Sequence, residues 1–128
     1  MTQQTVGFAD MLAELANEVS EISESKGFWD LDAMGETGMI PTKIALMHSE
    51  LSEALAVHRE PYDDPEGPSS YTGMTPTQEE DFCEELGDAF IRILDAVGFY
   101  GMADTFGRVT ISKIEKNRDR PFKHSKRY

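Results

Sequence analysis

Cysteine is nearly absent from this sequence of 128 residues, which holds a single thiol, Cys83. A disulfide within one chain is therefore excluded, and we expect Cys83 to be a buried thiol. Such low cysteine usage is typical of a reducing compartment. No apolar run approaches the roughly 18 residues that span a bilayer, and residues 1–10 lack the pattern of a secretory signal. We expect a cytoplasmic protein that does not insert into a membrane.

Positive charge is also scarce, with 12 basic against 24 acidic side chains and a formal net charge of −12. Residues 1–107 carry a net charge of −18, whereas residues 108–128 carry +6. An acidic body of this kind repels nucleic acid and anionic lipid, so a nucleic-acid partner is disfavoured. The basic end is either a solvated tail or a place where a phosphate group binds.

Four stretches have helical periodicity and none has a convincing strand pattern, which predicts an all-α protein. The length and the 39% apolar content suit one domain, 1–128, and no internal repeat is visible. Helices joined by linkers suggest a four-helix bundle. The expected helices cover residues 5–26, 41–59, 77–99 and 102–117, separated by a linker at 27–40 and a long loop at 61–76, and followed by a basic tail at 118–128.

Local signals mark the ends of these helices. Gly27 fits a C-cap glycine, and Pro41 suits the first turn of the second helix. Thr77, followed by Glu80 three residues later, has the spacing of a capping box at the start of the third helix. The side chains expected to face the core are Phe8, Met11, Leu12, Leu15, Val19, Ile22, Ile44, Met47, Leu51, Leu55, Val57, Phe82, Leu86, Ala89, Phe90, Ile93, Val97, Phe106, Val109, Ile111 and Ile114.

Two pairs of carboxylates, Glu50 with Glu53 and Glu85 with Asp88, each have a spacing of three residues. That spacing puts both members on one helix face, about 5–6 Å apart, where like charges repel. Glu50 and Glu85 flank the apolar stripes of their helices, and a carboxylate turned half inward is costly unless it is paired or binds a metal. Four hard oxygen donors suit Mg²⁺ or Mn²⁺, whereas Arg92 could pair with only one of them.

The basic end offers a second pattern. Lys113, Asn117 and Arg120 recur at steps of four and three, so they share one face if the last helix continues. Their side chains could bind phosphate oxygens, or they could form a solvated helix end that complements the helix dipole. Trp29, the single tryptophan, is either a cap on the core or a platform on which a base stacks, and the sequence favours neither.

Three segments in order resemble the MazG-like branch of the all-α nucleoside triphosphate pyrophosphohydrolases: HSELSEALAVHRE, EELGDAFIRILD and KIEKNRDRPFKHSKRY. The pattern of that family is EExxE, a gap, then ExxD. Ser49 stands where the pattern begins with Glu, which leaves the number of bound ions open. The KGFW run, residues 26–29, resembles the segment before the second helix in small bacterial and phage-borne members.

This resemblance implies a helical bundle that assembles as a homodimer or homotetramer. It also implies Mg²⁺-dependent hydrolysis of a nucleoside triphosphate to the monophosphate and pyrophosphate, with Mn²⁺ able to replace Mg²⁺. The residues that match the family's metal-binding and catalytic positions are Glu50, Glu53, Glu85 and Asp88, with Glu53 as a candidate general base. The implied substrate-binding residues are Lys113, Asn117 and Arg120, which match the Lys-x-x-x-Asn-x-x-Arg ending, together with Lys26 and Trp29.

Two alternatives stay open. A dimeric dUTPase or a phosphoribosyl-ATP pyrophosphohydrolase would use the same scaffold, and the choice of base or sugar cannot be read from these residues. A non-catalytic, acidic helical interaction module would instead carry the carboxylates as surface charge alone.

Overall fold

The computed structural model describes residues 2–30 and 39–121. Over these residues the chain is all-α, with four helices and no strand, as predicted. Most of the predicted linker 27–40 and of the basic tail 118–128 lies outside the described residues. The helices are α1 (Gln3–Ser25), α3 (Met39–Arg59), α4 (Pro76–Phe99) and α5 (Ala103–Arg118), each within two residues of its predicted bounds.

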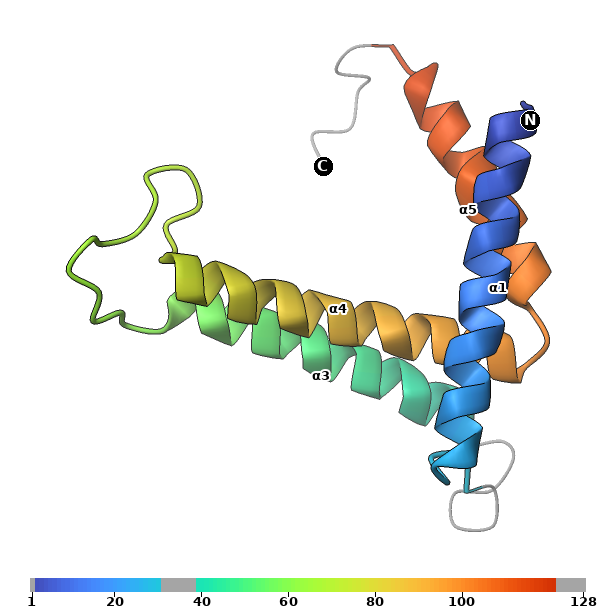
Figure 1. Cartoon of the computed structure of the whole chain (residues 1–128), viewed down its shortest axis with the longest axis horizontal. Helices are drawn as coiled ribbons and strands as arrows, with labels where there is room; N and C mark the ends of the chain where they lie inside the picture. The colour runs from blue at the N-terminus through green and yellow to red at the C-terminus, as the bar shows by residue number, and fades with distance from the viewer. Residues whose placement is uncertain (1, 31–38, 122–128) are drawn as a thin grey trace.

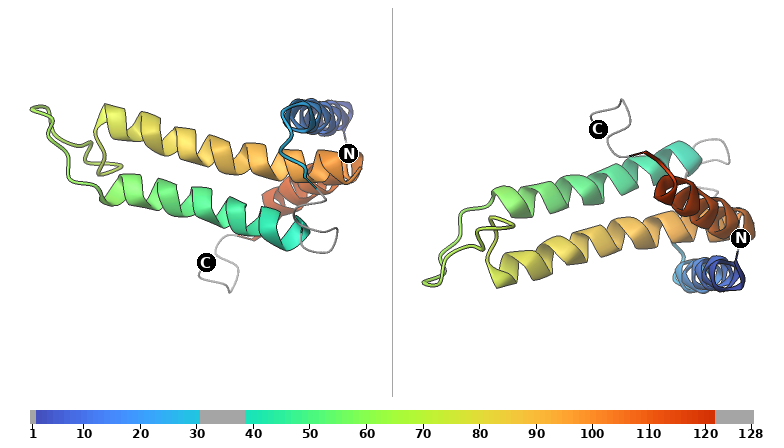
Figure 2. Two further views of the ribbon diagram at one scale, coloured as in Figure 1. Left: turned by 90° about the horizontal axis from the view of Figure 1, so that it is seen from below. Right: turned by 90° about the horizontal axis from the view of Figure 1, so that it is seen from above.

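The helices form two crossed pairs (Figure 1). α3 and α4 lie side by side as a long antiparallel hairpin, and α1 packs on α5 and crosses the carboxyl-terminal end of α4. Figure 2 shows α1 on the side of α4 that faces away from α3. In the described part of the chain, no helix is both long and apolar enough to cross a membrane.

Small residues allow α1 to lie very close to its two neighbours. Ala9, Ala13 and Ala16 are buried on the face of α1 that packs inward. A Cβ atom added to Gly98 of α4 would lie 2.3 Å from the carbonyl oxygen of Ala16, and one added to Gly107 of α5 would lie 2.3 Å from that of Ala9. Since no side chain fits at such distances, these glycines set how closely the helix backbones approach.

The larger apolar side chains of α1 are more exposed than the sequence pattern predicts. Phe8, Met11 and Ile22 are 47%, 64% and 56% exposed, because the alanine face beside them makes the contacts with α4 and α5. The prediction that they face the core is therefore wrong for a single chain. It is also wrong for the following residues, all of them exposed: Leu15, Ile44, Leu51, Leu55, Leu86, Phe90, Val109 and Ile114.

A capping box begins α4, but it lies two residues before the predicted one. The Thr75 hydroxyl accepts a hydrogen bond from the Gln78 N–H at 3.2 Å, and the Gln78 side chain accepts one from the Thr75 N–H at 3.0 Å. Pro76 then takes the first helical position, where its missing N–H costs nothing. The prediction of Thr77 and Glu80 as the box is therefore wrong, because α4 has already begun at Pro76.

Candidate metal centre and adjoining pocket

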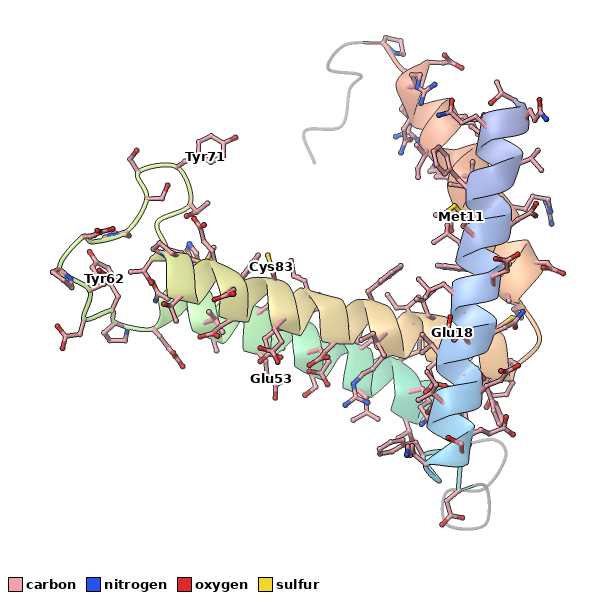
Figure 3. The ribbon with its side chains drawn as sticks, in the orientation of Figure 1. Met11, Glu18, Glu53, Tyr62, Tyr71 and Cys83 are labelled. Atoms are coloured by element: carbon pink, nitrogen blue, oxygen red, sulfur yellow. The ribbon has the colours of Figure 1, made fainter. Side chains whose placement is uncertain are left out.

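Three of the four predicted acids converge on the α3–α4 hairpin. One carboxylate oxygen from each of Glu50, Glu53 and Glu85 lies within 4.8 Å of the other two. Neighbouring oxygens on an octahedral Mg²⁺ at about 2.1 Å lie about 3.0 Å apart, so the three carboxylates would draw closer together to share a single ion. Figure 3 shows Glu53 projecting from the side of the hairpin, open to solvent. We call these three residues the acidic cluster.

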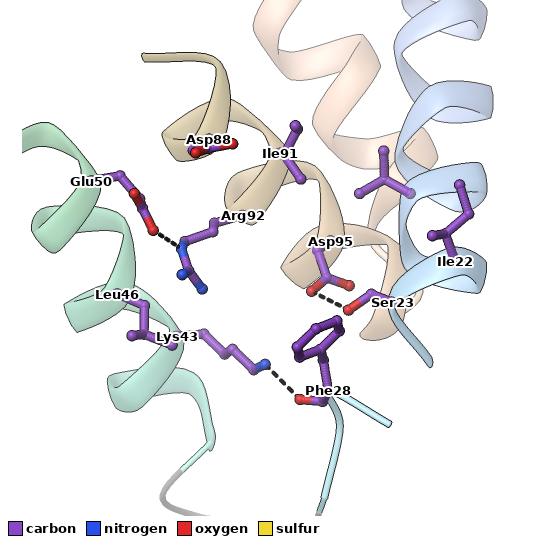
Figure 4. A pocket seen from close by; sticks show the side chains of 11 residues that line it. Ile22, Ser23, Phe28, Lys43, Leu46, Glu50, Asp88, Ile91, Arg92 and Asp95 are labelled. Carbon is purple, nitrogen blue, oxygen red and sulfur yellow. Dashed lines mark hydrogen bonds and ion pairs between the residues drawn. The ribbon is translucent and has the colours of Figure 1, made fainter. Parts of the chain in front are cut away.

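Asp88, the fourth predicted acid, borders the acidic cluster without joining it. It lies one turn after Glu85 on α4 and is exposed. Together with Glu50 it lines a pocket that begins at the cluster (Figure 4). Glu50 and Asp88 are therefore the two of the four predicted acids that line the pocket.

The pKa values of Glu50 and Glu53 are shifted in opposite directions. Glu50 is buried and accepts a hydrogen bond from Nε of Arg92 at 2.6 Å. This bond lowers the pKa of Glu50, although burial acts in the opposite direction. The pKa of Glu53 is raised, first by its hydrogen bond with Glu50 and then by the negative charges of Glu50 and Glu85. Glu50 therefore holds its charge at lower pH, while Glu53 keeps its proton to higher pH.

The adjoining pocket has a volume of about 630 Å³ and lies among α1, α3 and α4 (Figure 4). Its volume is in the range of pockets that enclose small organic ligands, about 300–1,000 Å³. Two cations, Lys43 and Arg92, and two further polar residues, Ser23 and Asp95, line it. Its apolar walls come from Val19, Ile22, Phe28, Leu46 and Ile91.

Trp29 lies outside this lining and packs against the end of α4. Its indole stacks on Phe99, with 3.7 Å between ring centroids, and its Nε1 donates to Asp95 at 2.8 Å. The Nζ atom of Lys43 lies 4.1 Å from the ring centroid. Since Phe99 covers one face of the indole, Lys43 covers the other. A base could stack on Trp29 only if Lys43 moved away.

Phe28, the neighbour of Trp29, is placed differently. It lines the pocket and is 66% exposed, and Lys43 donates to its carbonyl oxygen at 2.9 Å. Lys26, the other residue predicted from the KGFW run, is exposed just after α1 and does not line the pocket.

The predicted phosphate-binding residues of the basic end lie apart from the acids. Lys113 and Asn117 are exposed on α5, and Arg120 follows the end of that helix. α5 leads away from the α3–α4 hairpin, and none of the three residues lines the pocket (Figure 1). The fold therefore does not bring them to the acidic cluster within one chain.

Arg92 pairs with one of the four acids, as the sequence indicated it could, but the positions of Lys43, Arg92 and Asp95 in the pocket were not predicted. A signal for them was present. Lys43 precedes Glu50 by seven residues, and Arg92 and Asp95 follow Asp88 by four and seven, which are spacings of a shared helix face. Extending the face of each acid pair by two turns would have found all three.

Cys83 is exposed, so the prediction of a buried thiol is wrong. Figure 3 shows Cys83 and Glu53 on opposite sides of the α3–α4 hairpin. The thiol is therefore turned away from the acidic cluster.

Comparisons of the chain with protein-family models, curated proteins and solved structures gave no match. Function is therefore inferred from the residues of this site and from the resemblance described above.

Proposed function

We propose that the protein hydrolyses the α–β phosphoanhydride of a ribo- or deoxyribonucleoside triphosphate, giving the monophosphate and pyrophosphate with the aid of Mg²⁺. The observation that carries this proposal is the convergence of Glu50, Glu53 and Glu85 from two helices, beside a pocket that also contains cations. The MazG-like order of the sequence segments supports the same chemistry.

The donor set fits Mg²⁺, with Mn²⁺ as a substitute. All three converging groups are carboxylates, the hard donors that these ions prefer, and Asp88 is one helical turn away. The pKa of Glu53 is raised first by its hydrogen bond with Glu50 and then by the negative charges of Glu50 and Glu85, and a divalent cation would offset those charges. When bound, such an ion neutralises phosphate charge and acidifies a water molecule. Glu50, Glu53, Glu85 and Asp88 would hold it.

Glu53 is the best-placed general base. It is the most exposed member of the acidic cluster, so a water molecule can reach it. Glu50 is less suited to this role, because it is buried and a water molecule reaches it less easily.

The pocket beside the cluster would hold the nucleoside. Its lining combines apolar walls with a few polar groups, which is the usual composition of a site for an organic ligand. Phe28 presents an exposed ring to this space and would stack on the base. Trp29 lies outside the pocket, where Phe99 and Asp95 fix its indole. It would therefore hold the adjacent Phe28 in place.

A second copy of the chain is the proposed partner, as a homodimer or homotetramer. Phe8, Met11 and Leu15 are exposed along α1 and line an apolar groove of about 510 Å³ that also includes Ile111 of α5. Apolar side chains gathered in this way are typical of an interface. Light scattering should give a mass above that of one chain, and Met11→Lys should lower it. Asn17→Lys, an exposed position on the same helix, should leave it unchanged.

Oligomerisation would also give the basic end a place in the reaction. Lys113, Asn117 and Arg120 are remote from the acidic cluster of their own chain, so their proposed contact with phosphate requires the site of a partner copy.

Pyrophosphate release tests the proposed function. The panel holds the eight common ribo- and deoxyribonucleoside triphosphates, dUTP and phosphoribosyl-ATP, each with and without Mg²⁺. We expect release that requires the metal and falls by roughly 100-fold or more in Glu53→Gln, the loss expected for a general base. Glu84→Gln, an exposed acid beside the cluster on α4, should keep full activity. Release from none of these compounds would overturn the proposal and favour a non-catalytic interaction module.

A further inference from the structure

The guanidinium of Arg92 is only partly used in this structure. Its side chain is 38% exposed and reaches from α4 across to Glu50 on α3 (Figure 4). Arginine has five N–H donors, and the bond from Nε to Glu50 uses one of them. Among the described residues, no acceptor meets the remaining four. These donors lie in the lining of the pocket, next to the acidic cluster.

The second cation of the pocket is already committed. Lys43 donates to the carbonyl oxygen of Phe28 and lies over the Trp29 ring. Burial, the largest influence on Lys43, lowers its pKa. Lys43 is therefore engaged with the aromatic segment, whereas four of the five donors of Arg92 meet no acceptor in the described part of the chain.

The bond between Arg92 and Glu50 depends on the charge of the cluster. Arg92 neutralises part of the negative charge of three close carboxylates. A divalent cation held by the same carboxylates would repel the guanidinium and take over its stabilising role. Phosphate oxygens beside the cluster would then offer the displaced guanidinium an anionic acceptor whose geometry matches its fork of N–H donors, in competition with Asp88 and Asp95 of the same pocket.

We propose that Arg92 exchanges partners when substrate binds: it leaves Glu50 once a divalent cation occupies the acidic cluster, and it then donates to a phosphate oxygen of the nucleoside triphosphate. This inference rests on the proposed function and adds a phosphate-binding residue from the same chain as the acids.

Two binding measurements separate this role from a structural one. Mn²⁺ binding without nucleotide is followed by electron paramagnetic resonance. Calorimetry then measures binding of the α,β-methylene analogue of the nucleotide that the panel identifies, in excess Mg²⁺. Both are made on the wild type, Arg92→Gln, Arg92→Lys and the control Arg59→Gln, an exposed arginine outside the pocket.

We expect Arg92→Gln to bind Mn²⁺ as tightly as the wild type or more tightly, because a competing cation has been removed. Its affinity for the analogue should fall roughly 10- to 100-fold, as expected for a lost hydrogen bond to a charged group. Arg92→Lys should recover part of this loss, since it restores the charge without the fork. Arg59→Gln should match the wild type in both measurements.

Two results would overturn the inference while leaving the proposed function intact. Weaker Mn²⁺ binding in Arg92→Gln would show that Arg92 only holds Glu50 in place. Unchanged binding of the analogue would show that Arg92 does not contact phosphate. If the wild type releases pyrophosphate from no compound of the panel, the proposed function fails, and this inference fails with it.

Discussion

The indole of Trp29 lies parallel to the ring of Phe99, with 3.7 Å between centroids and 3° between the ring planes. Its Nε1 also donates to Asp95, so Trp29 fastens the segment after α1 to the end of α4. Phe28, the preceding residue, is left free to project into the pocket. Two adjacent aromatic residues thus have different surroundings, and their substitutions should have different effects.

Phe28→Ala should weaken substrate binding with little loss of stability, because its ring is 66% exposed. We expect KM for the preferred nucleotide to rise about 5- to 30-fold, since stacking on an aromatic ring contributes about 1–2 kcal/mol. Trp29→Ala should instead lower the free energy of unfolding by about 2–4 kcal/mol, through lost packing and the unpaired Asp95. Steady-state kinetics and urea unfolding measure the two effects. A larger KM effect for a folded Trp29→Ala would favour base stacking on Trp29.

Gly98→Ala should destabilise the protein by about 1–3 kcal/mol, because the new methyl group would meet the backbone of α1 at Ala16. A backbone contact cannot be relieved by the rotation of a side chain, so α1 must shift. Thermal unfolding measures this loss. Gly7→Ala is the matched control, since a Cβ atom there meets nothing within 4 Å, and it should stabilise α1 by up to about 1 kcal/mol. Equal stability of the two variants would contradict the close approach of α1 and α4.

Thr75→Ala should lower the free energy of unfolding by about 1–2 kcal/mol, because the hydroxyl caps a buried N–H group of α4. Thr77→Ala tests the other threonine that the sequence offered as the cap, and it should change stability by less than about 0.5 kcal/mol. Urea unfolding of both variants gives the comparison. A larger loss of stability in Thr77→Ala than in Thr75→Ala would contradict this cap and favour Thr77, the cap predicted from the sequence.

The stability of the metal-free protein should fall as pH rises through the raised pKa of Glu53. Between the ordinary pKa of a glutamate and this raised value, the folded chain binds more protons than the unfolded chain at Glu53, so deprotonation favours unfolding. Glu50 acts in a lower window. Since its pKa is lowered, its contribution is lost as pH falls from the ordinary value through the lowered one.

Urea unfolding in the presence of a chelator, at a series of pH values, separates these windows. Glu53→Gln should remove the fall at the higher pH, because glutamine does not ionise, and Glu84→Gln should keep it. The same slope in Glu53→Gln and the wild type would show that Glu53 does not cause it.

The sequence predicts the helices well because their signals are local. Apolar periodicity and the prolines at 41, 61 and 76 place the helix ends to within two residues. Which face is buried is not local. On α1, the stripe with Ala9, Ala13 and Ala16 and the stripe with larger side chains have the same period. The close approach of Gly98 and Gly107, visible only in the fold, selects the alanines.

The candidate site can be predicted from the sequence only within each helix. Spacing alone puts Glu50 near Glu53 and Glu85 near Asp88, since each pair shares one helix face. The convergence of Glu50 with Glu85 depends on the register of α3 against α4, which a single sequence does not determine. The same register brings Arg92 to Glu50, a contact that no spacing within one helix reveals.

Thermal unfolding with and without Mg²⁺ tests most directly whether the acidic cluster binds a divalent cation. Because an ion that binds only the folded state stabilises it by mass action, Mg²⁺ at about 100 times its dissociation constant should add about 2.7 kcal/mol and raise Tm by several degrees. Glu53→Gln and Glu85→Gln should reduce or abolish this rise, and Glu84→Gln should keep it. A wild-type Tm that responds to neither Mg²⁺ nor Mn²⁺ would contradict the metal centre, and with it the proposed hydrolysis.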